Sequence, residues 1–312
     1  MSTCTSVSRT LAEPLAGTAA TARTWLLVEQ PGPWGAKALT ASRLDPGLGR
    51  ALEEAAKGTG VRVALIRRPG RNDPAAAPAR RRVYAAHTVP GRAWLHTALV
   101  TDPERLRALD LEALGAGAPD SFDTVLHGAP HTGGPLVCVC ANGKRDQCCA
   151  LLGRPLAADL AARGTEDVWE TTHLGGHRFS PTLLVLPHGY AYGRADTASV
   201  RAVLDAARSG RVLTDGCRGL SAWERPGQAA ELAVREASGE DRAGVLSVAS
   251  APPGEDPALH HFTVRHVDGG SWHVEVAQSM PGPPRPESCG AALGTPARME
   301  VRSVTPQPPT AV

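Results

Sequence analysis

Aromatic side chains are scarce in this chain of 312 residues, which contains only three Phe, three Tyr and six Trp. Glycoside hydrolysis needs two carboxylates placed across the scissile bond, commonly with aromatic platforms nearby, and we recognise no such acid pair in the sequence. An excess of one charge is also lacking, because 33 basic residues offset 31 acidic ones. The net charge of +2 gives no general attraction to nucleic acid, and we expect no nucleic-acid partner.

Long apolar runs are missing as well. No stretch approaches the ~20 apolar residues that a membrane-spanning helix needs, so we expect no membrane partner. Residues 1–23 are small and polar and lack the apolar centre of a secretory signal, and we predict a disordered tail there. The expected location is cytoplasmic.

Cysteine is present in an odd number, seven, and four of the seven lie within residues 138–149. In a reducing cytoplasm such crowding indicates metal binding or catalysis rather than a disulfide framework. The C-x-x-C pair typical of thiol–disulfide enzymes is absent. Cys4 falls in the predicted tail, and Cys217 and Cys289 are isolated. We expect core or loop roles for the last two, although the polar loop around Cys289 could approach a redox site.

The length of the chain favours more than one hydrophobic core. In residues 24–131 an Asp45-Pro46 pair predicts the start of a helix, because Asp caps helices and Pro suits their first position. Apolar runs predict strands over 24–29, 61–67, 81–86 and 94–100. This region is therefore expected to form an α/β unit.

Residues 132–220 form a second predicted unit, in which a strand, helix and strand are followed by two strands and a helix. This order is that of a thioredoxin-like fold. The elements are expected over 135–140, 148–163, 167–171, 182–186, 190–192 and 197–208. Residues 221–312 are predicted to form an extension with a helix over 221–237, a β-hairpin within 243–278 and an irregular Pro-rich end. The predicted fold is thus α/β and thioredoxin-like, with two α/β units and this C-terminal helix and hairpin.

Two short segments carry the candidate chemistry. The first runs from Cys138 to Cys149 at a strand-to-helix turn, and the second is His173-Leu174-Gly175-Gly176-His177 at another turn. A soft metal centre requires thiolates and imidazoles that converge. A helix N-terminus and the cations Lys144 and Arg145 both favour the thiolate form that metal binding needs.

The runs VCVCANGKRDQCCALLGRPLAADL and ETTHLGGHRFSPTLLVLPHGYAYG, with VEQPGPWGAKAL and LIRRPGR further upstream, resemble the sucrase/ferredoxin-like family of thioredoxin-like ferredoxins. The similarity covers most of residues 24–240. It implies a [2Fe–2S] cluster held by a C-x8-C pair and an H-x3-H pair, which Cys140, Cys149, His173 and His177 match. It also implies a degenerate thioredoxin-like first unit.

This resemblance implies electron transfer with redox partner proteins, a reductase or an acceptor that remains unidentified. We expect an electron carrier rather than a stand-alone enzyme, and sucrose hydrolysis has no support. Two neutral imidazoles in place of thiolates should raise the reduction potential, as in His-ligated Rieske centres, which lie at about −150 to +300 mV against about −400 mV for plant-type ferredoxins.

Three alternatives stay open. Cys138 or Cys148 could replace Cys140 or Cys149 as a ligand, because all four lie close together in the sequence. A Cys2His2 site also suits Zn²⁺, which would make the protein a zinc-stabilised binding or scaffold protein. A metal-free thiol–disulfide redox protein is the third reading, although it leaves the two histidines unexplained.

Overall fold

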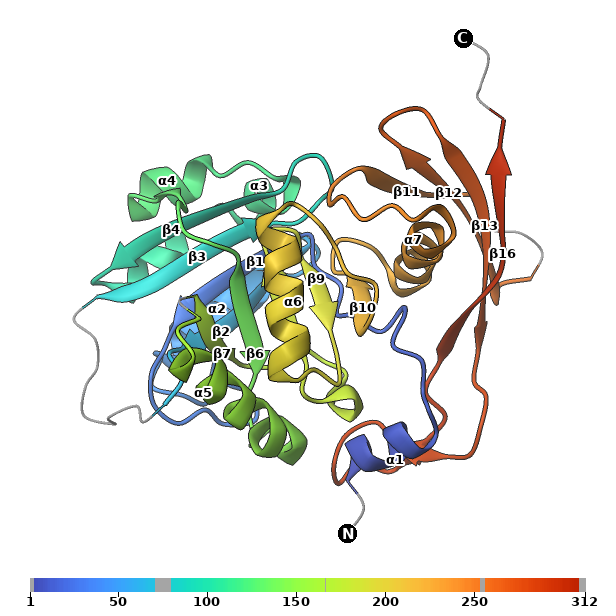
Figure 1. The fold of residues 1–312 in the computed structure, drawn as a ribbon. Coiled ribbons are helices and arrows are strands. Elements are labelled where there is room, and N and C mark those ends of the chain that lie inside the picture. The colour runs from blue at the N-terminus through green and yellow to red at the C-terminus, as the bar shows by residue number, and fades with distance from the viewer. Residues whose placement is uncertain (1–2, 71–79, 166, 253–255, 309–312) are drawn as a thin grey trace.

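A computed structural model describes residues 3–70, 80–165, 167–252 and 256–308 (Figure 1). The first half of its main sheet follows the order predicted for residues 24–131. Its elements are β1 (Thr24–Glu29), α2 (Pro46–Ala55), β2 (Val61–Arg67), β3 (Arg81–His87), β4 (Trp94–Val100), η1 (Pro103–Ala108), α3 (Leu111–Ala116), α4 (Asp120–Leu126) and β5 (Ala129–Pro130). Asp45 caps α2 as expected, since its side chain accepts a hydrogen bond from the backbone N–H of Leu48 at 2.8 Å.

The second half of the sheet contains the predicted elements in the predicted order, together with a short 3-10 turn and a last strand that were not predicted. These are β6 (Leu136–Cys140), the π-helical turn η2 (Cys149–Gly153), α5 (Arg154–Ala162), β7 (Val168–Thr171), η3 (His177–Phe179), β8 (Leu183–Leu186), β9 (Tyr190–Tyr192), α6 (Thr197–Arg208) and β10 (Cys217–Leu220). The single helix expected over 148–163 begins instead with a π-helical turn.

The two halves belong to one sheet of ten strands, in the order β10-β9-β8-β6-β7-β2-β1-β3-β4-β5. Each half repeats one pattern, because β1 pairs in parallel with β2 and antiparallel with β3, while β6 pairs in parallel with β7 and antiparallel with β8. The halves meet where β2 and β7 pair antiparallel. The predicted α/β class is therefore confirmed, and the two units are joined edge to edge rather than forming separate sheets.

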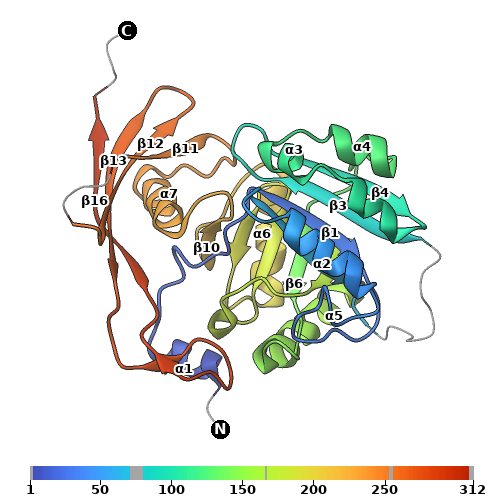
Figure 2. The ribbon, with the colours of Figure 1, turned by 180° about the vertical axis from the view of Figure 1, so that it is seen from behind.

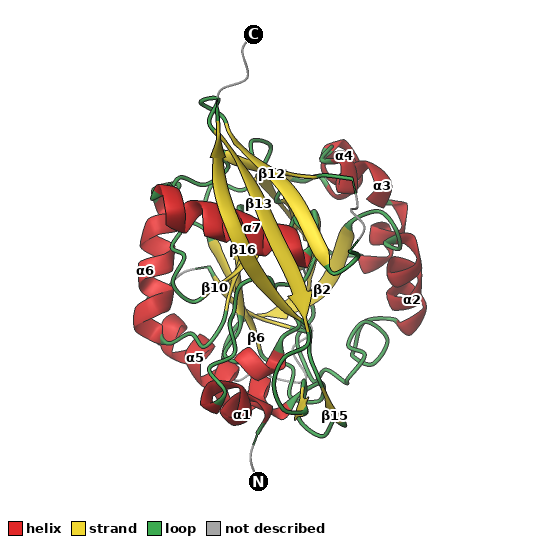
Figure 3. Ribbon diagram, turned by 90° about the vertical axis from the view of Figure 1, so that its right-hand side faces the viewer, coloured by secondary structure: helices red, strands yellow, loops and turns green. Residues whose placement is uncertain are grey.

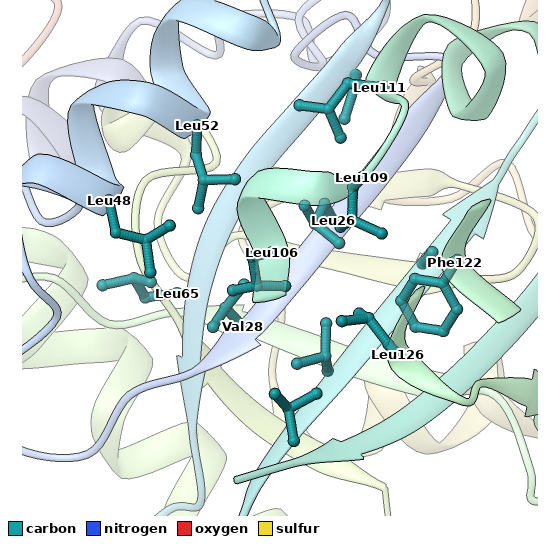
Figure 4. Packing of buried hydrophobic residues seen from close by; sticks show 14 of the residues in the cluster. Leu26, Val28, Leu48, Leu52, Leu65, Leu106, Leu109, Leu111, Phe122 and Leu126 are labelled. Atoms are coloured by element: carbon teal, nitrogen blue, oxygen red, sulfur yellow. The ribbon is translucent and has the colours of Figure 1, made fainter. Parts of the chain in front are cut away.

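Three cores are associated with this sheet. On the outer side of the first half, α2, η1, α3 and α4 cover β1 to β4 (Figure 2), and Leu26 and Val28 of β1 pack against Leu48 and Leu52 of α2 (Figure 4). A second core lies between the second half and helices α5 and α6. The third core joins both halves, with Trp25 and Leu27 from β1 and Leu136, Cys138 and Trp169 from the second half in one cluster. The candidate cysteines of β6 face this shared core.

The predicted disordered tail is wrong for the described part of residues 1–23, which begins at residue 3. Helix α1 (Cys4–Thr10) packs beside η3, and Cys4 is only 2% exposed. Glu13 is buried and pairs with the guanidinium groups of Arg178 and Arg285 at 3.3 and 2.7 Å. A buried carboxylate with two cationic partners fixes this segment, although its composition alone resembles a solvated tail.

The C-terminal extension contains α7 (Arg225–Ser238), which packs on a second sheet of four strands (Figure 3). Its strands pair antiparallel in the order β11 (Leu246–Ser250), β12 (Leu259–His266), β13 (Ser271–Ser279) and β16 (Arg298–Gln307). The predicted hairpin is β12–β13. The Pro-rich end is not irregular throughout, because β16 pairs along the whole of β13, and β14 (Arg285–Pro286) pairs with β15 (Leu293–Gly294). None of the helices among the described residues has the length and apolarity to cross a membrane.

One buried ion pair links the two halves of the main sheet. Arg67 of β2 lies opposite Glu170 of β7, and the shortest nitrogen–oxygen distance between the two side chains is 2.6 Å. The guanidinium also donates to the carbonyl oxygen of Gly32 at 2.9 Å and stacks on the ring of Trp34. Both charged side chains are almost fully buried. Each therefore needs the opposite charge of the other to offset its loss of hydration.

We expect Glu170→Ala to lower the free energy of unfolding by about 3–5 kcal/mol, because it leaves the Arg67 guanidinium buried without its carboxylate. Urea titration of the purified protein measures this change. Glu104→Ala is a matched control that removes the solvent-exposed partner of Arg107, and it should cost less than about 1 kcal/mol. Similar losses in both variants would contradict the assigned role of the buried pair.

Candidate metal centre

Cys140 and Cys149 lie side by side at the end of β6. Their Sγ atoms are 3.5 Å apart, and both side chains are buried. Gly153, at the end of η2, lies directly against this strand, since a Cβ there would come within 2.1 Å of the Cys140 carbonyl oxygen. The lack of a side chain at Gly153 lets the π-helical turn approach the strand, and turns of this kind are frequent at functional sites.

The histidine loop leaves β7 at the same end of the sheet, because β7 runs parallel to β6 with Thr171 opposite Cys140. His177 Nδ1 lies 3.1 Å from the Sγ of Cys149. The ring of His173 stacks on that of His177, with ring centroids 4.5 Å apart. The two predicted histidines are therefore brought to the two predicted cysteines.

The donor atoms do not all lie equally close. Those of Cys140, Cys149 and His177 are within 4.8 Å of one another, whereas His173 lies outside this group and contacts it through His177. Cys138 is buried two residues earlier in β6 and belongs to neither of the two potential metal-binding groups among the described residues. Cys148 belongs to the other group, with Cys4, Asp146 and Cys289.

The two thiols have different acidities. The contact with the Cys149 thiol is the main cause that holds the pKa of Cys140 below its usual value, even though burial acts in the opposite direction. The same interaction, together with burial, raises the pKa of Cys149. Cys140 is therefore the thiol that ionises first, and thiolates are the form that binds metal.

Burial is the main cause of the low pKa values of the two imidazoles, about 3 for His173 and about 4 for His177. The positive charges of Arg145 and Arg218 act in the same direction on both rings. Both rings are consequently neutral near pH 7 and keep a lone pair, as a metal ligand must.

Arg218 of β10 holds the histidine loop in place. Its fully buried guanidinium donates to the carbonyl oxygen of Gly175 at 3.1 Å and to the hydroxyl of Thr18 at 3.0 Å, and it also donates to the Thr18 carbonyl oxygen. Gly176 has a left-handed φ of +69°, and a Cβ there would come within 2.1 Å of Arg218 Nη2. The loop therefore needs glycine at this position both for its backbone conformation and for the approach of the arginine.

One side of the centre opens to the surface. A cavity of about 210 Å³ is lined by His173, which is partly exposed, and by three cationic side chains, Lys37, Arg62 and Arg145, with Glu53 as its acidic member. Arg62 also donates to the carbonyl oxygen of His173 at 2.9 Å. Among the four candidate ligands, His173 is the one that reaches solvent.

The sequence alone indicated neither the position of Arg218 beside the histidine loop nor the burial of Cys4. It also did not predict that Cys289 lies against Cys148. An arginine in a segment with no predicted element carries no signal of burial, and Cys4 lies in the segment predicted to be a disordered tail. Cys289 lies beside the candidate centre, because its Sγ is 3.2 Å from the Sγ of Cys148, whose neighbour is Cys149; that this centre is a redox site stays a prediction.

Comparison with known proteins adds one finding. A family model described as sucrase/ferredoxin-like matches residues 15–219, well over half of the chain. The match includes the four candidate ligands and Arg218 but not Cys4, Cys289, α7 or the four-stranded sheet. Searches of the curated proteins and of the solved structures give no match.

We expect Gly176→Ala to destabilise the protein by roughly 1–3 kcal/mol more than Gly210→Ala, because only the first places a methyl group against a buried guanidinium. Gly210 is a matched control with a similar φ of +66° and open space around its Cα. Urea titration gives the stabilities, and metal analysis of the purified variants should show a loss only in Gly176→Ala. Equal stability and equal metal content would contradict the role assigned to this contact.

Proposed function

Because this chain belongs to the sucrase/ferredoxin-like family, we propose that it is an electron-transfer protein with a [2Fe–2S] cluster held by Cys140, Cys149, His173 and His177. The observation that carries the proposal is the convergence of two thiols and two stacked imidazoles at one end of the sheet. Cysteine thiolates and histidine nitrogens are known ligands of such clusters, which supply one-electron transfer when bound.

The donor set fits this group chemically. Cys140 is set to ionise, and both imidazoles are neutral near pH 7. Two thiolates and two neutral rings carry two fewer negative charges than four thiolates, so the added electron meets less repulsion. This favours a reduction potential in the range of His-ligated centres rather than that of all-Cys plant-type ferredoxins.

Two cations near Cys140, Arg62 partly buried and Arg218 fully buried, support the same conclusion. Arg62 and Arg218 each interact electrostatically with Cys140. Burial lowers the pKa of Arg218, to about 9, but leaves it charged near pH 7. Positive charge held in a weakly polar interior stabilises an additional negative charge beside it, so these residues would favour the reduced state.

We also propose that both halves of the sheet are thioredoxin-like, with the first half degenerate. The common strand pattern, β2-β1-β3-β4 in one half and β7-β6-β8-β9 in the other, supports this relationship. The candidate cysteines follow the first strand of the second half, the turn at which thioredoxin-like folds place reactive cysteines. The corresponding turn of the first half, between β1 and α2, contains no cysteine.

The cavity beside His173 supports docking of a redox partner protein with an acidic surface. Lys37 and Arg145 are exposed at this cavity, and Arg62 is partly buried in it. Complementary charges act mainly on the rate of encounter. An electron would then enter or leave at the ligand nearest to solvent, His173.

A zinc-stabilised binding or scaffold protein is the second candidate function. The distance of 3.1 Å between Cys149 Sγ and His177 Nδ1 favours it, because donors this close suit a single ion better than two separate irons. Zn²⁺ accepts Cys2His2 ligands in a tetrahedral arrangement. Such a protein would have no redox activity.

Anaerobic purification followed by iron, sulfide and zinc analysis separates these candidates. We expect a brown protein with about two irons and two sulfides per chain. Cys140→Ser and Cys149→Ser should abolish or transform the electron paramagnetic resonance spectrum of the reduced protein. Cys138→Ala should leave it unchanged, because Cys138 lies outside both donor groups. A colourless protein that contains zinc and no sulfide would contradict the electron-transfer function and support the zinc function.

We further expect His177→Cys to lower the reduction potential by roughly 100–200 mV, because a thiolate returns one negative charge to the ligand set. Redox titration monitored by visible absorption measures the shift. Cys138→Ala serves again as the control and should keep the wild-type potential. If a His177→Cys variant still holds its cluster and its reduction potential is unchanged, His177 is not a ligand.

A further inference from the structure

We propose that Cys4, Cys148, Cys289 and Asp146 form a second metal site, a closed tetrahedral Zn²⁺ site that joins helix α1 and the loop between β14 and β15 to the second half of the main sheet. Cys4 begins α1, Cys148 precedes η2, and Cys289 lies in the loop between β14 and β15. Cys4 and Cys289 lie outside the residues that match the family model. This site shares no donor residue with the candidate centre at Cys140 and Cys149.

The geometry is that of a metal site rather than of a chance contact. The three Sγ–Sγ distances are 3.6 Å for Cys4–Cys148, 3.2 Å for Cys148–Cys289 and 3.4 Å for Cys289–Cys4. Four tetrahedral Zn–S bonds of about 2.3 Å would place sulfurs about 3.8 Å apart. A small expansion of the triangle is enough to admit the ion.

The fourth donor is Asp146, whose Oδ2 lies 3.7 Å from the Sγ of Cys4. Its carboxylate is held by two backbone N–H groups, from Cys148 to Oδ1 at 2.8 Å and from Cys289 to Oδ2 at 2.7 Å. Such hydrogen bonds orient first-shell ligands in metal sites.

The types of donor atom in this group favour Zn²⁺. Three sulfurs and one carboxylate oxygen are ligands that Zn²⁺ accepts, and four protein ligands leave no open position, as in structural zinc sites. On binding, the thiol protons pass to solvent and the three sulfurs bind as thiolates. A disulfide accounts for the cluster less well, because it needs an S–S distance of about 2.05 Å and would leave the third thiol unpaired.

Other contacts bring the same three segments together. Glu13, which follows α1, bridges Arg178 of η3 and Arg285 of β14. Thr5 of α1 donates its hydroxyl to the carbonyl oxygen of His177 at 3.1 Å. The second site would therefore hold α1 and the Cys289 loop over the His177 side of the first centre. Because the ligands are distant in sequence and meet only in the folded chain, zinc binding would also stabilise the native state.

Metal analysis of the full-length protein from zinc-supplemented medium tests the site. We expect Cys289→Ser to lose about one zinc per chain and to keep the iron content and visible spectrum of the wild type. Trypsin should also cleave after the exposed Arg9 faster in this variant, because α1 is no longer fixed. Cys4→Ser should give the same result. Cys217→Ala is the control, since this buried cysteine belongs to neither donor group and its loss should not change the zinc content.

The outcomes separate this site from the proposed function. Cys140→Ser should lose the metal of the first centre and keep the zinc bound by Cys289. If that first metal proves to be zinc, the electron-transfer function fails while the second site still stands, because Cys289→Ser then removes one zinc of two. Equal zinc content in the wild type and in Cys289→Ser overturns the second site. A disulfide between any two of Cys4, Cys148 and Cys289, found by mass spectrometry of the unreduced protein, also overturns it.

Discussion

The parallel pairing of β6 with β7 is the constraint on which the candidate centre depends. It places Thr171 opposite Cys140, so the histidine loop must start at the same end of the sheet as the cysteine turn. Arg218 then limits where the loop can go, because its buried guanidinium binds the carbonyl oxygen of Gly175 and lies against Gly176. The donors are thus positioned by backbone pairing and by one buried cation, before any metal is present.

Burial sets the chemistry of the positioned groups. The imidazoles are neutral because a charged ring would be poorly solvated there, and the contact between the two thiols lowers the pKa of Cys140 and raises that of Cys149. In the proposed cluster, neutral nitrogen ligands and nearby guanidinium groups would both favour the uptake of an electron. Among the four candidate ligands only His173 reaches solvent, so the basic cavity beside it is where the proposed redox partner would dock.

The N-terminal segment and the loop around β14 and β15 complete the surroundings of the centre. Glu13 and Cys4 from the N-terminal segment meet Arg285 and Cys289 from the C-terminal loop on the same side of η3. A carboxylate bridging two arginines and a triangle of thiols hold these segments together. A zinc ion bound in the triangle, as proposed, would give the second site a structural role next to the candidate centre.

The sequence by itself determined the α/β class, most strands and helices, and the short list of thiols and imidazoles. Each of these depends on local patterns, such as the apolar run of β6, the Asp45-Pro46 helix start and the close spacing of Cys140 with Cys149. Only the tertiary structure separated Cys138 from Cys140, joined the two units into one sheet, and placed Arg218 beside the histidine loop. It also showed that Cys4 and the segment around Glu13 are packed rather than solvated. These features depend on contacts between residues that are not neighbours in the sequence, such as Arg218 with Gly175 and Cys4 with Cys148. Composition and periodicity reflect only the requirements of residues close together in the sequence.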